Sequence, residues 1–402
     1  MVDIERLKGL QKLGQSAREG GKKMSVYHQM GHHSANLLND ANLTKYSGAI
    51  LSPVNYNETE VIFQVNSVSK PEFEMIFDPQ MYYPQSERGK LRKWDYFPSD
   101  VDTADLQSEA WWCQIVDNLV ATSTRIKVNS VCSPALAPRV YSNNYYSTMV
   151  NIGNYLTDTL KGSGISPIQT VLVNIAELSN STKVLEIASI ISRTNAQSIY
   201  LVLVSNIPPR RELANTEEIK GAMKLIHTLE GSGLKVIVGY SSSDIILWKA
   251  AGATACASGK FFNLRRFTSS RFEEPSEGGG QLPYWFEESV LAFLRESDLI
   301  RVNNANLLSI ASLENPFGKE ILHNLRNSPE EPWLGLSWRQ YLYAFADIEE
   351  RIEKGLDVAN ILKQAENTWL EVEDKGILME EMRNNGAWIR IWRRAVLEFK
   401  SF

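Results

Sequence analysis

The chain has 402 residues, of which 43% are hydrophobic and 22% are charged, so it is long enough for a large core and more than one domain. Its formal net charge of −5 excludes a global basic field, which would mark a nucleic-acid-binding protein, but leaves room for a local basic patch. The three cysteines, Cys113, Cys132 and Cys256, are too widely spaced for a zinc pattern, and their odd number argues against a disulfide framework.

The N-terminal residues 1–24 are polar and carry charges of both signs. We expect them to form a polar helix or arm, because a signal peptide needs an apolar run that they lack. No apolar stretch of the sequence is long enough to span a membrane. These features favour a cytoplasmic protein.

From residue 25, short apolar segments alternate with helical stretches. The expected strands cover residues 25–31, 48–56, 74–83, 130–138, 170–178, 198–206, 235–244 and 254–262. The fifth to seventh are rich in Val, Ile and Leu, which is typical of strands buried on both faces. Eight such units over roughly 240 residues match the size of a closed barrel. We predict a (β/α)8 TIM barrel over residues 25–272. An open doubly wound sheet is the alternative, but its usual glycine-rich first turn is absent.

A turn-rich linker, residues 273–283, follows the predicted barrel. The remaining residues, 284–402, have a helical pattern from YWFEESVLAFLRESDLI onward and predict a C-terminal helical domain. The segment WIRIWRRAVLEFK places arginines among tryptophans at helical spacing. Such a helix could grip a nucleic acid. The interpretation we favour is that the tryptophans pack on a neighbour while the arginines face solvent.

Polar residues follow the predicted strands, and in a TIM barrel these positions converge on one mouth. The candidates for acid–base catalysis are Asp78, Glu177 and His28. Asp78 interrupts an apolar strand immediately before a proline, and a structural hydrogen-bonding role is its alternative. The candidates for substrate binding are Asn55, Gln80, Tyr82, Asn174 and Asn206. For Asp244, which precedes a helical stretch, we expect an N-terminal capping role.

The loops after the seventh and eighth strands of a TIM barrel often hold a phosphate. Here GYSSSD supplies glycine, hydroxyls and a helix N-terminus, and SGKFFNLRR supplies three cations. The predicted phosphate-binding residues are Gly239, Ser242, Lys260, Arg265 and Arg266. The alternative is that the two arginines pair with the acidic linker EEPSE or with the helical domain.

Three segments, GAILSPVNY, EMIFDPQMYYP and VGYSSSDIILWKAAGATACASG, resemble motifs of the tRNA-guanine transglycosylase superfamily of barrels. Members of that superfamily exchange a base on tRNA or, in some relatives, on DNA. The resemblance implies that Asp78 recognises the base. Two departures stand against it: no carboxylate lies near Ala257 and Ser258, where the nucleophile of the superfamily falls, and the zinc site of three cysteines and a histidine is absent.

The leading hypothesis is therefore an enzyme of glycosyl-transfer type that acts on a nucleobase, a nucleotide or a nucleic acid, without metal or cofactor. A non-catalytic recognition subunit of a larger assembly is the first alternative, because the expected nucleophile is missing. An unrelated barrel enzyme is the second, using a flavin at the phosphate corner or a metal on His28, His32 and Asp78. A protein partner or a homo-oligomer is compatible with all three hypotheses.

Overall fold

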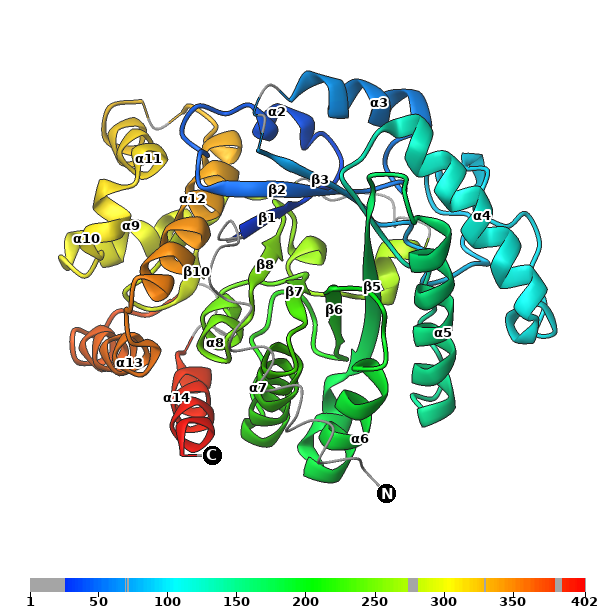
Figure 1. Cartoon of the computed structure of the whole chain (residues 1–402). Helices are drawn as coiled ribbons and strands as arrows, with labels where there is room; N and C mark the ends of the chain where they lie inside the picture. The colour runs from blue at the N-terminus through cyan, green and yellow to red at the C-terminus, as the bar shows by residue number, and fades with distance from the viewer. Residues whose placement is uncertain are drawn as a thin grey trace.

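Eight parallel strands close into a barrel at the centre of the molecule (Figure 1). The computed structural model of the chain describes residues 26–68, 70, 72–273, 281–328, 330–379 and 385–401. The barrel strands are β1 (Val26–Gln29), β2 (Tyr46–Leu51), β3 (Glu74–Phe77), β4 (Ser130–Cys132), β5 (Ser166–Asn174), β6 (Ser198–Val204), β7 (Lys235–Gly239) and β8 (Ala255–Ser258). Because β1 pairs in parallel with β8 as well as with β2, the ring is complete. The predicted TIM barrel is confirmed, and the open sheet is excluded.

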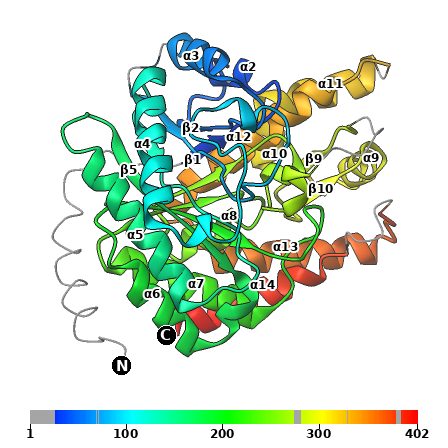
Figure 2. The same ribbon diagram turned by 90° about the vertical axis from the view of Figure 1, so that its right-hand side faces the viewer.

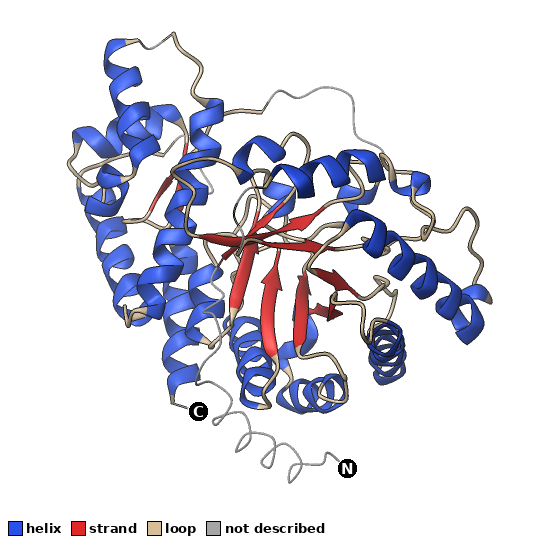
Figure 3. Cartoon of the chain, turned by 45° about the horizontal axis from the view of Figure 1, so that its top comes forward, coloured by secondary structure: helices blue, strands red, loops and turns tan. Residues whose placement is uncertain are grey.

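Helices surround the strands, as Figure 3 shows. They are α2 (Ala35–Leu38), α3 (Glu58–Ser67), α4 (Glu109–Ile126), α5 (Asn143–Thr159), α6 (Ser181–Ile191), α7 (Thr216–Gly231) and α8 (Ile245–Ala250). Several begin at a side chain that accepts a hydrogen bond from the first helical turn, such as Ser108 before α4 and Asn215 before α7. Such caps satisfy backbone N–H groups that have no partner within the helix, so the sequence itself encodes these helix starts.

The register of β1 decides which of its side chains face the barrel interior. The Tyr200 hydroxyl on β6 donates to Gln29 Oε1 at 2.8 Å. Since β1 and β6 are not neighbours in the ring, both side chains must lie inside it. Successive residues of a strand point to opposite faces. His28 therefore faces outward, where its ring meets that of Tyr46 with centroids 6.0 Å apart.

The C-terminal helices pack on one flank of the barrel and share its hydrophobic core. They are α9 (Glu296–Asn304), α10 (Ile310–Glu314), α11 (Pro316–Asn327), α12 (Leu334–Glu353), α13 (Val358–Asp374) and α14 (Ala387–Lys400). Figure 2 shows α13 and α14 side by side near α7, and these helices are in contact. On α8, the buried ammonium of Lys249 lies 2.8 Å from Glu353 and 3.4 Å from Glu349 of α12. This buried cluster ties α12 to the barrel.

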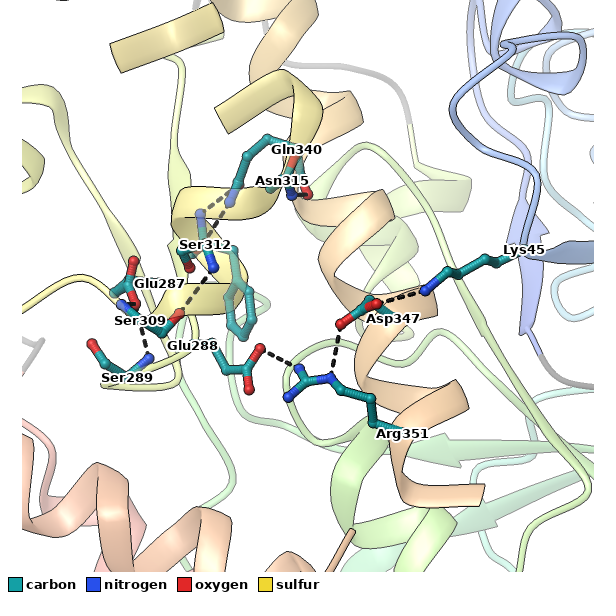
Figure 4. Close-up of polar contacts among 11 residues, drawn as sticks. Lys45, Glu287, Glu288, Ser289, Ser309, Ser312, Asn315, Gln340, Asp347 and Arg351 are labelled. Carbon is teal, nitrogen blue, oxygen red and sulfur yellow. Dashed lines mark hydrogen bonds and ion pairs between the residues drawn. The ribbon is translucent and has the colours of Figure 1, made fainter. Parts of the chain in front are cut away.

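The expectation of a helix directly after residue 284 is wrong. The chain instead forms an antiparallel hairpin of β9 (Trp285–Glu287) and β10 (Ala292–Leu294). The Glu287 carboxylate accepts from the backbone N–H of Ser289 at 2.9 Å and of Ser309 at 2.8 Å, which fixes the hairpin turn (Figure 4). The Gln340 amide of α12 donates to the Phe286 carbonyl and accepts from its N–H, as a neighbouring strand would. These distant contacts override the local helical pattern.

A chain of charges joins the hairpin to the barrel through α12 (Figure 4). Lys45 Nζ lies 2.5 Å from Asp347 Oδ1, and Arg351 Nε lies 2.8 Å from Asp347 Oδ2. The same arginine pairs with Glu288 of the hairpin. Partly exposed pairs of this kind contribute little stability singly, but together they tie the turn of the hairpin to α12 and to the start of β2.

Candidate functional site

Asp78 follows β3 and lies at the mouth of the barrel, where only 1% of its surface is exposed. Its Oδ1 accepts from the Gln80 backbone N–H at 3.0 Å, and its Oδ2 accepts from the Tyr82 hydroxyl at 2.8 Å. Burial raises the pKa of Asp78 to about 6, although both hydrogen bonds and the charge of Arg271 act in the opposite direction. The carboxyl is therefore able to change its protonation state close to neutral pH.

Residues 267–272, which we call the mouth cover, close the barrel above this carboxyl. Phe267 and Phe272 meet Tyr82 edge to face, with ring centroids 5.2 and 5.5 Å apart. Within the 3-10 helix η5 (Ser269–Phe272), Arg271 donates from Nη2 to Ser52 Oγ at 2.9 Å. The mouth cover therefore seals Asp78 from solvent.

Three of the five predicted substrate-binding residues gather around Asp78. The Asn55 amide donates to Ser52 Oγ at 2.9 Å, and Ser52 donates to Gln80 Oε1 at 3.2 Å. Tyr82 binds Asp78 directly, as described above. We call Ser52, Asn55, Asp78, Gln80, Tyr82 and Arg271 the inner cluster.

The other two predicted substrate-binding residues lie apart from the inner cluster. Asn174 ends β5, and its side chain accepts from the Ala176 N–H, capping the 3-10 helix η3 (Ile175–Ser179). Asn206 is exposed in the loop between β6 and α7. Neither residue contacts Asp78 in the part of the chain that the structure describes.

The structure does not bring Glu177 or His28 to Asp78. Glu177 belongs to η3 and raises the pKa of Tyr141 and Tyr146, so it lies near α5. Burial lowers the pKa of His28 to about 3, and the charge of Lys260 adds to this shift. His28 is thus a neutral ring on the outside of the barrel. From there it cannot exchange a proton with a ligand at the barrel mouth. The sequence analysis expected the His28 side chain at the mouth, but a shift of one position along a strand moves a side chain to the opposite face of the sheet.

A second region at the same end of the barrel is open. A cavity of about 350 Å³ lies between the loops after β6 and β8, the β9–β10 hairpin and α14. A smaller cavity of about 40 Å³ shares Arg210, Phe262 and Tyr284 with it and reaches Lys260 and Arg265. We call the two cavities together the cationic–aromatic cleft. Further residues that line it are Glu212, Ser242, Trp338, Tyr341 and Trp388.

Arg265 is a buried cation with aromatic neighbours. It is 2% exposed, and its guanidinium carbon lies 3.9, 4.1 and 4.4 Å from the ring centroids of Phe262, Phe293 and Tyr341. Stacking on rings attracts a cation but does not neutralise its charge. Within the described residues, Arg265 Nε and Nη1 have no hydrogen-bond partner.

Lys260 is the second buried cation of the cleft, and it is 3% exposed. Its Nζ lies 4.2 Å from the ring centroid of Trp338 and donates to the His33 carbonyl at 2.9 Å. Burial lowers the pKa of Lys260 to about 8, with a further contribution from Arg339. In the described ranges, no carboxylate lies within ion-pair distance of Lys260 or Arg265.

Arg266 has carboxylate partners, unlike Arg265. Its Nη2 lies 3.7 Å from Glu212 Oε2 and 3.6 Å from Asp244 Oδ2. Asp244 also accepts from the Ser242 backbone N–H at 2.7 Å. Asp244 occupies the N-cap position of α8 as expected, but its side chain makes no capping hydrogen bond to that helix. The alternative partner of the arginines was the acidic linker, and its residues 274–280 lie outside the part of the chain that the structure describes.

Two further predicted phosphate-binding residues have different surroundings. Ser242 lines the larger cavity and belongs to the cleft. Gly239 lies inside the barrel, where a Cβ would come within 2.5 Å of the Tyr200 ring. Gly239 thus makes room for Tyr200.

Helix α14 contributes a wall of the cleft rather than a basic surface. Trp388 and Trp392 are buried, and Trp388 lines the larger cavity. Arg390 and Arg393 pair with Glu366 of α13, at 2.9 and 3.3 Å. The packing interpretation of this helix is confirmed.

The structure separates the residues of the metal hypothesis. His28 faces outward while Asp78 lies at the mouth, so these two cannot bind one ion together with His32. Among the described residues, no group of three or more His, Cys, Asp or Glu side chains is arranged to hold a metal. No described helix has the length and apolar character needed to cross a membrane.

Comparisons with known proteins add little to this geometry. No family model and no curated protein matches the chain. One solved structure of similar fold is an HpcH/Hpal aldolase/citrate lyase family protein from Burkholderia cenocepacia J2315, with 9% identity, coverage of 62% of this chain and 92% of that chain, and a TM-score of 0.37. A D-psicose 3-epimerase has 11% identity, coverage of 64% of this chain and 93% of that chain, and a TM-score of 0.32. A mutant O-GlcNAc hydrolase from Thermobaculum terrenum has 11% identity, coverage of 93% of this chain and 94% of that chain, and a TM-score of 0.39. Similarity this low carries no argument about this chain, whose barrel is established by its own strand pairing. The resemblance to the tRNA-guanine transglycosylase superfamily gains no support.

Proposed function

We propose that this chain binds a nucleotide, free or as a unit of a nucleic acid, in the cationic–aromatic cleft. The observation that carries the proposal is the pair of buried cations, Lys260 and Arg265, beside a cavity and without a carboxylate partner among the described residues. A buried charge that has no counter-charge is strongly unfavourable. A phosphate group would supply the counter-charge, and guanidinium groups bind phosphate with two parallel hydrogen bonds.

The larger cavity offers rings on which a base can stack. Phe262, Tyr284 and Trp388 line it, and stacking on an aromatic side chain contributes about 1–3 kcal/mol per base. Tyr284 Oη and Trp388 Nε1 are buried and have no partner within the described residues. As donors, they complement the oxygen and nitrogen acceptors of a sugar or a base. An acceptor-rich aromatic anion therefore matches both the charge and the lining of the cleft.

Titration calorimetry with the four ribonucleoside 5′-monophosphates tests this proposal. Arg210 is exposed beside the Phe262 ring and lines both cavities. We expect Arg210→Glu to weaken binding by about tenfold or more, because it replaces a charge-assisted hydrogen bond with repulsion. Arg139→Glu is the matched control, since Arg139 is exposed after β4, at the same end of the barrel and outside the cleft lining. The proposal is wrong if no monophosphate binds, or if both substitutions have the same effect.

Base exchange of the glycosyl-transfer type is a second candidate, favoured by Asp78. A carboxyl whose pKa is about 6 is suited to proton transfer or base recognition near neutral pH. This function requires the mouth cover to move, because Phe267 and Phe272 seal Asp78 in the closed form. Incorporation of labelled guanine into tRNA, abolished by Asp78→Asn with the fold intact, would support it. Nucleotide binding without any incorporation would favour the recognition role instead.

A further inference from the structure

Glu212 is a carboxyl group in the wall of a cleft that is otherwise suited to anions. It lies in the loop between β6 and α7 and lines the larger cavity, with 14% of its side chain exposed. Its Oε1 accepts from Ser243 Oγ at 2.8 Å. Its Oε2 is buried and has no hydrogen-bond partner within the described residues. One oxygen is thus fixed by a hydrogen bond, and the other has, in the described part of the chain, only the Arg266 guanidinium nearby, at 3.7 Å.

Two carboxyl groups share one cation at this point. Arg266 Nη2 lies 3.7 Å from Glu212 Oε2 and 3.6 Å from Asp244 Oδ2. Each acid accepts one further hydrogen bond, Asp244 from the N–H of Ser242 and Glu212 from Ser243 Oγ. The other charged groups near Glu212 are Arg265, from the segment after β8, and Arg210 and Arg211, from its own loop. With both acids ionised, a bound phosphate would place a third negative charge beside them.

We propose that Glu212 takes up a proton from solvent when the phosphate-bearing ligand binds and then donates a hydrogen bond to that ligand. The step forms one O–H bond at Glu212 Oε2 and breaks no bond of the ligand. Arg266 remains paired with Asp244. This inference rests on the proposed nucleotide-binding function and adds a proton to it.

The surroundings of Glu212 bring its pKa close to neutral, so that a bound anion can cause it to take up a proton. Burial, supported by the negative charge of Asp244, raises the pKa of Glu212 to about 7, against the opposing effects of Arg266, Ser243 and Arg265. An anion bound nearby raises the pKa further, because it disfavours the ionised form. The complex therefore holds the proton at a pH where the free protein has lost it.

Calorimetry in buffers with different ionisation enthalpies measures the protons that accompany binding. The probe is the methyl ester of a nucleoside 5′-monophosphate, because its phosphodiester does not titrate near neutral pH, unlike a monoester. At about pH 8 we expect Glu212 to take up close to one proton, with a further fraction at Lys260, whose pKa of about 8 a bound phosphate also raises. The affinity of the wild-type protein for the probe should then fall by up to about tenfold for each pH unit above 7.

Two variants assign the proton to its residue. At about pH 8, Glu212→Gln should take up close to one proton fewer than the wild-type protein, and only the smaller uptake at Lys260, whose pKa is about 8, should remain. Glu217→Gln is the control, because Glu217 is a 51% exposed carboxylate on α7 and should leave the uptake unchanged. If Glu212 had only a structural role, Glu212→Gln would change the affinity for the probe without changing the number of protons taken up on binding.

The possible results separate the two proposals. Tight binding by the wild-type protein without proton uptake overturns the inference about Glu212 and leaves nucleotide binding standing. An uptake in Glu212→Gln equal to that of the wild-type protein also overturns it. Absence of probe binding at both about pH 6 and about pH 8 overturns the proposed function, and the inference with it. If Glu212→Gln does not fold, the number of protons taken up by the wild-type protein still tests the inference.

Discussion

The inner cluster and the cationic–aromatic cleft lie at the same end of the barrel, but they differ in how their buried charges are paired. In the inner cluster, both oxygens of Asp78 accept hydrogen bonds, Arg271 donates to Ser52 although its Nε has no partner among the described residues, and the mouth cover closes over them. In the cleft, Lys260 and Arg265 stack on rings, face a cavity and have no carboxylate partner among the described residues. A buried charge with its own partners is compatible with a structural role. A buried cation that faces a cavity without a counter-charge is one that a bound anion would stabilise.

Two of the buried arginines, one in each region, give the largest expected difference between these regions. Arg265→Met should weaken nucleotide binding by about tenfold to a hundredfold, because charge-assisted hydrogen bonds contribute about 1.5–3 kcal/mol each. Arg271→Met, in the inner cluster, should leave that affinity unchanged, since its guanidinium binds Ser52. Calorimetry on the two variants measures both effects.

The same two variants, Arg265→Met and Arg271→Met, should rank differently in free energy of unfolding than in nucleotide affinity. Arg265→Met replaces an unpaired buried cation with an apolar chain, so its free energy of unfolding should equal or exceed that of the wild-type protein. Arg271→Met leaves Ser52 without this donor and should unfold more easily. Equal affinity losses in both variants would contradict the division between cleft and inner cluster.

The second prediction concerns the pH dependence of stability that comes from Asp78. In an unfolded chain this carboxyl has a pKa near 3.9, whereas in the folded protein its pKa is about 6. Between these values the folded protein binds more protons than the unfolded chain, so stability should fall as pH rises from about 4 to about 6, on the order of 2 kcal/mol in all. Urea unfolding of wild type and Asp78→Asn over this range isolates the contribution. A wild-type curve parallel to that of the variant would show that Asp78 titrates normally.

The third prediction is a smaller loss of stability in the inner cluster. Tyr82→Phe removes the hydroxyl that donates to Asp78 and leaves a buried carboxyl oxygen with one partner fewer. The free energy of unfolding should decrease by about 1–3 kcal/mol. Nucleotide affinity should not change. A loss of affinity as large as that of Arg265→Met would instead place the ligand at the barrel mouth.

The smallest expected effect lies on α14, where Arg394→Ala removes an exposed pair with Glu398. Neither nucleotide affinity nor binding of tRNA should change measurably, because this arginine is not among the residues that line the cleft and is already paired. Trp388→Ala, six residues earlier, removes a wall of the larger cavity and should weaken nucleotide binding. A clear loss of tRNA binding in Arg394→Ala would revive the basic-surface interpretation of this helix.

Local sequence patterns were sufficient for the barrel and for part of its mouth. Alternating apolar strands and capped helices are local features, and they placed Asp78, Gln80, Tyr82 and Asn55 together. The face of His28 was not predictable in the same way, because a strand of four residues leaves its register open by one position. That register is set by distant contacts such as the one between Gln29 and Tyr200.

Residues that act across long stretches of sequence were missed. Arg271 reaches Ser52 across 219 positions, and Tyr284 and Trp388 join the cleft from the hairpin and the last helix. Glu212 was missed as well, since a single acid in a polar loop has no local pattern. The available signal was the density of cations after β8, which pointed to Lys260 and Arg265 without showing what encloses them.

The most direct test of the central claim compares each ribonucleoside 5′-monophosphate with its nucleoside, by calorimetry on the wild-type protein. If the buried cations of the cleft hold a phosphate, at least one monophosphate should bind about a hundredfold or more tightly than its nucleoside, which corresponds to two charge-assisted contacts. Arg265→Met should remove most of that difference. Equal affinity for nucleoside and monophosphate would contradict the account, because the phosphate would then contribute nothing to binding.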